Sequence, residues 1–262
     1  MVQDPEVNSP DEAQPLVLIP VTAEDVARRT VRVRLTATVV VLAVLGAAGY
    51  LYKRSVDPLN AKESYDAGVR LFKIARYNQA ILSFDRAVAL KPDMVEGYMM
   101  RGKSYVGESK PEEALPNFSK AIELRPTDPE AWVERGAAYL DLNNYRAAIA
   151  DATKAIAVNP VQASAYALRG SAIRKSGDPQ KALGDFNRAV ELAPIANNFY
   201  ERGATYQMLE EHKLAIADFD QVIAIIPDLA SPFFARAASR RALGDLEAAE
   251  RDHRQGRILD GH

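Results

Sequence analysis

A period of 34 residues along most of the chain is the feature that most constrains its fold. Glycine recurs at this spacing from Gly68 to Gly170, Gly203 follows after 33 residues, and Ala237 takes the place after a further 34. An alanine lies 12 residues after each glycine and a proline 24 residues after it. A repeat of this length indicates small structural units that stack on their neighbours. The repeat-locked positions are Gly68, Gly102, Gly136, Gly170, Gly203, Ala80, Ala114, Ala148, Ala182, Ala215, Pro92, Pro126, Pro160, Pro194 and Pro227.

Larger residues complete the pattern, with tyrosine three positions after several of the glycines and phenylalanine sixteen positions after most of them. Small residues let two helices approach closely, aromatic rings fill the space beside them, and proline ends each second helix. The pattern resembles the tetratricopeptide repeat family, whose unit is a helix–turn–helix of 34 residues. This resemblance covers residues 61–260 and implies an all-α fold, a right-handed superhelix of six repeats: 61–94, 95–128, 129–162, 163–195, 196–229 and 230–260.

An arginine precedes the repeat-locked glycine in four repeats and the equivalent Ala237 in the sixth, where the family consensus has leucine. Repeats three to six also carry an aspartate sixteen residues after this arginine. We expect each arginine to pair with an aspartate of the same or the adjoining repeat, in preference to forming a ligand-binding row. The arginines are Arg101, Arg135, Arg169, Arg202 and Arg236, and the aspartates are Asp151, Asp185, Asp218 and Asp252.

Two repeats lack the phenylalanine. Ala152 replaces it in repeat three, which predicts a looser core there, and His253 replaces it in repeat six, which predicts a solvated surface. The last helix is also polar on the face that would stack on a further repeat, as expected of a terminal repeat. Its polar residues are Glu250, Arg251, Arg254, Gln255 and Arg257.

Residues 35–52 contain no charged residue, histidine or amide side chain, and charged residues flank them on both sides. At about 1.5 Å per residue a helix of this length reaches roughly 27 Å, close to the core of a bilayer. We therefore expect one transmembrane helix at 35–52, after a flexible proline-rich tail at 1–34. A short linker at 53–60 follows, with Asp57 and Pro58 starting the first helix of the solenoid.

Basic residues around this apolar segment predict its orientation. The fifteen residues before it hold four arginines, and the fifteen after it hold Lys53, Arg54 and Lys62. Because basic residues favour the cytoplasmic side, we expect a single-pass membrane protein with a cytoplasmic N-terminal tail. The solenoid would then be extracytoplasmic, which means periplasmic if the protein is bacterial, and the bilayer would be a partner through residues 35–52.

The sequence offers no pattern typical of catalysis or of metal binding. Cysteine is absent, the three histidines lie far apart, and no phosphate loop or nucleophile motif occurs. The net charge of -2 provides no basic excess for nucleic acid. We therefore expect no enzyme activity, no catalytic residue, no cofactor, no metal and no nucleic-acid partner.

Function is expected on the concave face, which the first helix of each repeat lines in the tetratricopeptide family. The resemblance places these residues of the chain on that face: Tyr65, Val69, Phe72, Met99, Lys103, Val133, Leu140, Arg174, Tyr200 and Gln207. We expect a membrane-tethered adaptor or scaffold that binds peptide or helical segments of partner proteins. The alternatives are a self-assembling structural scaffold, and so a homo-oligomer, or a non-catalytic accessory subunit of a membrane or envelope enzyme complex.

Overall fold

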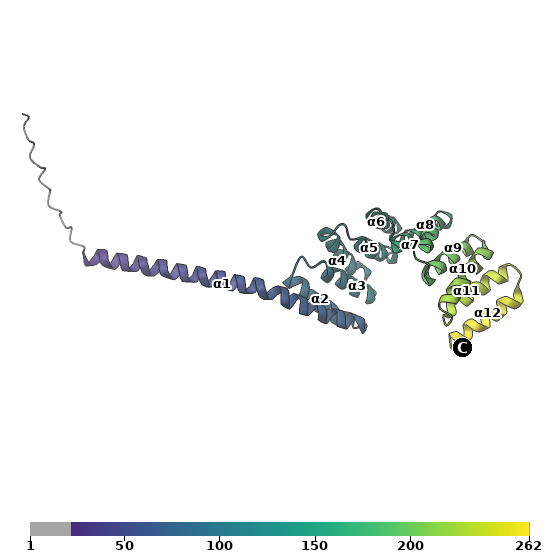
Figure 1. Cartoon of the computed structure of the whole chain (residues 1–262), viewed down its shortest axis with the longest axis horizontal. Coiled ribbons are helices and arrows are strands. Elements are labelled where there is room, and N and C mark those ends of the chain that lie inside the picture. The colour runs from purple at the N-terminus through teal and green to yellow at the C-terminus, as the bar shows by residue number, and fades with distance from the viewer. Residues whose placement is uncertain (1–21, 262) are drawn as a thin grey trace, which may run out of the picture. The chain divides into compact units, whose positions relative to one another are not determined.

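The computed structural model describes residues 22–261, and the only regular elements among them are twelve helices (Figure 1). In chain order they are α1 (Ala23–Lys73), α2 (Tyr77–Leu90), α3 (Val95–Gly107), α4 (Pro111–Leu124), α5 (Pro129–Asp141), α6 (Tyr145–Val158), α7 (Ala163–Lys175), α8 (Pro179–Leu192), α9 (Ala196–Met208), α10 (His212–Ile225), α11 (Ala230–Ala242) and α12 (Leu246–Leu259).

Local sequence sets the limits of these helices. The side chains of Asp128, Asn144, Asp178 and Asp245 accept hydrogen bonds from backbone N–H groups in the first turns of α5, α6, α8 and α12. The helices α2, α4, α6, α8 and α10 each end two residues before a repeat-locked proline. Since proline disfavours helical backbone in the residue before it, the prediction that these prolines end the second helices is confirmed.

The chain divides into two compact units within α1, at 1–56 and 57–262. In the second unit each helix packs on the next, and the helices α3, α5, α7, α9 and α11 also contact one another in order. Phenylalanine rings fill the interior of four repeats, where Phe84, Phe118, Phe186 and Phe219 are fully buried. A Cβ added to Gly68 would lie 2.6 Å from the ring of Phe84, so only glycine leaves room for the ring.

The membrane prediction is wrong. The backbone from Ala23 to Lys73 forms one helix of 51 residues, and it passes through Pro58 without ending. Among residues 22–261, no helix has an apolar stretch that is long enough to cross a membrane. The prediction treated residues 35–52 in isolation, whereas they are the middle of a longer helix that also carries charged pairs such as Arg28–Glu24. The predicted single-pass topology, with a cytoplasmic tail, an extracytoplasmic solenoid and the bilayer as a partner, depended on this helix and is wrong as well.

The predicted tail at 1–34 and linker at 53–60 also differ from the structure. Residues 23–34 and 53–60 are helical and belong to α1. Residues 1–21 lie outside the described part of the chain. The charged and polar residues that indicated a tail are therefore compatible with helix, because arginine, glutamate and alanine all have high helix propensity.

Repeat three is not loosely packed, because repeat four supplies the missing side chain. Ala152 is fully buried, and Leu168 of α7 is only 7% exposed. A Cβ added to Gly136 would lie 2.7 Å from the Cδ2 of Leu168, which shows that this leucine takes the place of the absent phenylalanine ring. In repeat six, His253 is exposed as predicted, and its ring contacts Phe234 at a centroid distance of 5.5 Å.

Candidate protein-binding face

The ten predicted groove residues lie on α1, α3, α5, α7 and α9, the first helices of repeats one to five. Met99 is buried and the other nine are half-buried. Three aromatic residues pack inside their own repeats: Tyr65 on Phe84, Tyr200 on Phe219 and Phe72 on Tyr77, at centroid distances of 5.3–5.7 Å. This face is therefore partly the floor of the solenoid, and only part of each side chain is available to a ligand.

Three polar residues of the predicted groove join one first helix to the next. The Nζ of Lys103 donates to Glu130 and lies 3.1 Å from an oxygen of Glu134, which links α3 to α5. Arg174 of α7 donates to the carboxylate and the backbone carbonyl of Glu201 in α9. These contacts show that the polar groove residues have structural partners.

Gln207 makes the corresponding link from α9 to α11. Its Nε2 donates to the carbonyl of Ala235 and to the hydroxyl of Ser239, both at 3.0 Å. Lys103, unlike the neutral amide of Gln207, carries a charge. Burial lowers the pKa of the Lys103 ammonium, but the hydrogen bonds and negative charges of Glu130 and Glu134 outweigh burial and raise this pKa above its ordinary value. Lys103 therefore joins α3 to α5 as a charged ammonium group.

A shallow pocket of about 240 Å³ lies on repeats one to three, over α1, α3 and the start of α5. It brings together three of the predicted groove residues, and its lining is Tyr65, Val95, Glu96, Met99, Met100, Lys103, Arg125, Asp128 and Glu130. The four apolar or aromatic side chains form the floor, and the charged ones form a rim. The arrangement suits a short segment that has an apolar side chain and polar neighbours. The remaining predicted residues do not line this pocket.

One rim carboxylate has a perturbed pKa. Arg125 Nη2 donates to Glu96 Oε1 at 2.8 Å, and this hydrogen bond is the main cause that lowers the pKa of Glu96. A carboxyl group with a lowered pKa contributes stability above its unfolded pKa, and this contribution is lost as the pH falls. Because both side chains are about half exposed, the contribution is at most about 1 kcal/mol.

We expect Arg125→Gln to raise the pKa of Glu96 towards the ordinary glutamate value, because the charged hydrogen bond is removed. An NMR titration of the Glu96 side-chain carboxyl carbon, in the wild type and in the variant, measures this change. Lys120→Gln is the control, since Lys120 pairs with Glu123 on a different helix. An unchanged Glu96 pKa in Arg125→Gln would show that the ion pair does not form in solution.

The repeated arginines form a row of ion pairs along the solenoid, which we call the ladder, and each arginine with its partners is one rung. In repeats three to six, Nε and Nη2 of the arginine donate to the aspartate sixteen residues later, at 2.6–2.9 Å, in the pairs Arg135–Asp151, Arg169–Asp185, Arg202–Asp218 and Arg236–Asp252. The predicted pairing is confirmed. Each guanidinium also lies 5.1–5.8 Å from the centre of the aromatic ring three residues earlier: Trp132, Tyr166, Phe199 and Phe233. Hydrogen bonding to Asp151 raises the pKa of Arg135 further.

A second set of ladder contacts joins repeats two, three, five and six to the repeat before each of them, and the sequence analysis missed it. The Nη1 of an arginine donates to the residue sixteen or fifteen positions earlier in four rungs: Arg101 to Asp85, Arg135 to Ser119, Arg202 to Asn187 and Arg236 to Asp220. In repeat two the aspartate is replaced by Asn117, which accepts from Arg101 Nε at 2.6 Å. In all four contacts the acceptor is the polar residue directly after the buried phenylalanine of the preceding repeat, and this pattern was the signal for them.

The described residues contain no group of three or more histidine, cysteine, aspartate or glutamate side chains that could hold a metal ion. Their buried aspartates are engaged in the ladder instead. Trp132, a candidate ligand platform by residue type, donates its indole N–H to the carbonyl of Pro126 at 3.0 Å and lies against Arg135. It is therefore a packing residue.

Comparison with known families decides the nature of the repeats. A family model described as tetratricopeptide repeat matches residues 133–196, and a second TPR repeat model matches residues 102–143. Residues 102–196 thus match models of the tetratricopeptide repeat. The same stacking of helices and the same arginine contacts continue outside these limits, in repeats two, five and six. No curated protein matches the chain.

Solved structures support the tetratricopeptide fold. PilW, a type IV pilus biogenesis factor, is 20% identical with a TM-score of 0.70, over 76% of this chain and 92% of PilW. A thermophilic TPR protein of Thermus thermophilus, TTC0263, is 20% identical with a TM-score of 0.59, over 70% of this chain and 98% of that one. The APC/C hetero-tetramer Cut9–Hcn1 contains a chain that is 16% identical with a TM-score of 0.70, over 81% of this chain and 43% of that one. At these identities the likeness concerns the fold.

Proposed function

We propose that this protein is a non-catalytic adaptor that binds a peptide or helical segment of a partner protein on the face of its first helices. The observation that carries the proposal is the pocket on repeats one to three, where an apolar floor is surrounded by charged side chains that are fixed by ion pairs. A fixed rim reduces the entropy lost on binding. The presence of a chain with the same fold in the Cut9–Hcn1 hetero-tetramer agrees with such a role.

The pocket can be tested without disturbing the core, because two of its lining residues are accessible. Met100 is half-buried and the side chain of Glu130 is 56% exposed, whereas Met99 belongs to the hydrophobic core. Substitution of Met99 would therefore test packing and not binding. Met100 and Glu130 are the better positions for variants and probes.

We expect a photo-crosslinking amino acid at Glu130 to capture a partner in cells, since this residue stands at the rim of the pocket. The same amino acid at Leu82, an exposed residue of α2, is the matched control. Adding Met100→Asp should reduce the Glu130 adduct about tenfold, which corresponds to about 1.4 kcal/mol of lost apolar contact. Equal adducts from Glu130 and Leu82, or an adduct that is insensitive to Met100→Asp, would contradict the proposed pocket.

A further inference from the structure

In the inner repeats, each second helix offers a defined surface to the first helix of the next repeat. One residue of this surface accepts a hydrogen bond from the arginine on the first helix of the following repeat, as Asp220 of α10 does from Arg236 of α11. Three residues later comes a β-branched apolar residue. Val88 is one of these, and it lies so close to α3 that a Cβ on Gly97 would be 2.8 Å from its Cγ1. The surface thus combines an acceptor for a cation with an apolar contact.

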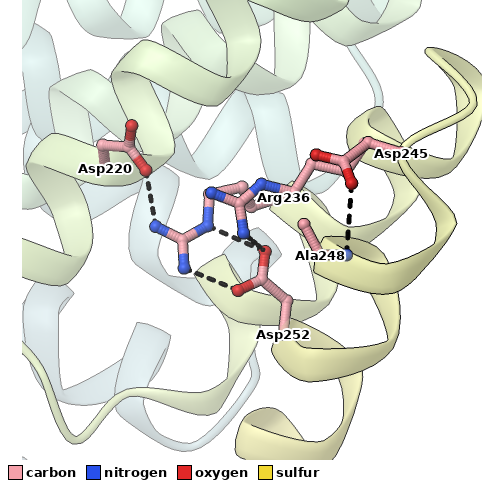
Figure 2. Close-up of polar contacts among 6 residues, drawn as sticks. Asp220, Arg236, Asp245, Ala248 and Asp252 are labelled. Atoms are coloured by element: carbon pink, nitrogen blue, oxygen red, sulfur yellow. Dashed lines mark hydrogen bonds and ion pairs between the residues drawn. The ribbon is translucent and has the colours of Figure 1, made fainter.

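In α12 the same positions carry a different chemistry. The residue 34 positions after Asp220 is Arg254, and the residues equivalent to Ile216 and Ile223 are Glu250 and Arg257. All three are exposed. Figure 2 shows the last rung before this surface, in which Arg236 contacts Asp220 on one side and Asp252 on the other. In α12 the position of the acceptor Asp220 is therefore occupied by the cation Arg254.

This end surface combines charge with an apolar contact. A shallow pocket of about 330 Å³ is lined by Glu250, His253, Arg254, Arg257 and Ile258, and Ile258 is 63% exposed. Within residues 22–261, neither Arg254 nor Arg257 has an ion-pair partner, in contrast to Arg251 of the same helix, which pairs with Glu247. The two unpaired guanidinium groups outweigh the single carboxylate of Glu250, so the site has a net positive charge beside an exposed isoleucine.

We propose that the exposed face of α12 binds an acidic helix of a partner protein. The partner helix would take the place that a further first helix would occupy. A carboxylate of the partner helix would contact Arg254. In the inner repeats the charges are reversed, because an arginine of the first helix contacts an acceptor on the preceding second helix. A helix with arginine at that position is disfavoured by repulsion from Arg254, whereas a carboxylate forms a bidentate pair. The surface therefore selects against another copy of the repeat and in favour of the opposite charge. It is separate from the pocket on repeats one to three and does not depend on it.

Two synthetic peptides test this proposal with the full-length protein. Both have the sequence of α9 (Ala196–Met208), which packs on the equivalent surface of α8, and both are stapled to hold the helix. One keeps Arg202 and the other carries Arg202→Glu. We expect the glutamate peptide to bind at least about tenfold more tightly by fluorescence anisotropy, with an affinity that falls as salt is added.

The decisive variant is Arg254→Glu, which should reverse the preference so that the arginine peptide binds more tightly. Arg251→Glu is the control, because Arg251 lies on the same helix but pairs with Glu247 and does not line the pocket, and it should leave the preference unchanged. The proposal would be overturned if the two peptides bind equally, if neither binds, or if Arg254→Glu leaves the order of affinities as it was. None of these results bears on photo-crosslinking at Glu130, so the two proposals fail separately.

Discussion

Asp218→Ala is expected to lower the free energy of unfolding by about 3 kcal/mol or more, because it leaves a partly buried arginine without its carboxylate. Asp218 is 4% exposed and accepts from Nε and Nη2 of Arg202 at 2.9 and 2.7 Å. The remaining hydrogen bond of Arg202, to Asn187, is neutral and cannot compensate the charge. Urea unfolding followed by circular dichroism measures the loss, and Asp228→Ala, at an exposed position, should change it by no more than about 0.5 kcal/mol.

Repeat two shows how the loss can be reversed. There the own-repeat acceptor is Asn117, and the neutralising carboxylate is Asp85 of the preceding repeat, 2.6 Å from Arg101 Nη1. The double variant Asn187→Asp with Asp218→Asn copies this arrangement around Arg202. We expect Asp218→Asn alone to cost about 1–3 kcal/mol and the added Asn187→Asp to recover most of it. If the second substitution recovers nothing, charge neutralisation is not what the ladder provides.

The ladder also shows how far sequence could predict this fold. Arginine and aspartate recur in the same register, and a helix pair brings residues of fixed register together, so the pairs within repeats could be predicted. The contacts from Arg101 to Asp85 and from Arg236 to Asp220 cross between repeats, and they depend on the offset between stacked helices. That offset is set by tertiary packing, and it cannot be read from the spacing of the repeats in the sequence.

The candidate site was predictable only in part for the same reason. The sequence placed Tyr65 and Lys103 on the first helices, and the structure brings both to one pocket. It could not show that Lys103 and Arg174 already have partners on the next helix, because those partners lie in other repeats. The membrane prediction failed because no helix among residues 22–261 is both long and apolar enough to cross a bilayer.

Leu168 is the residue whose loss should be felt most widely, since it belongs to one repeat and completes the core of another. Leu168→Ala removes the side chain that lies against Gly136 and opens a cavity beside Ala152. We expect a loss of about 2–5 kcal/mol, the usual range for a buried leucine changed to alanine. Hydrogen exchange should show faster opening of α5 and α6 as well as of α7 and α8.

Ala152→Phe supplies the matched test, because it restores the aromatic residue that repeats one, two, four and five have at this position. In the wild type it should destabilise by about 1–3 kcal/mol, since the new ring and Leu168 compete for the same space. In the Leu168→Ala background the ring fills the cavity as Phe118 fills the space beside Gly102, so the double variant should be more stable than either single variant. Additive losses would mean that Leu168 does not occupy the phenylalanine site. A compensating double variant would show that one interior position of this array can be filled from either of two neighbouring repeats, which makes repeats three and four a single cooperative unit.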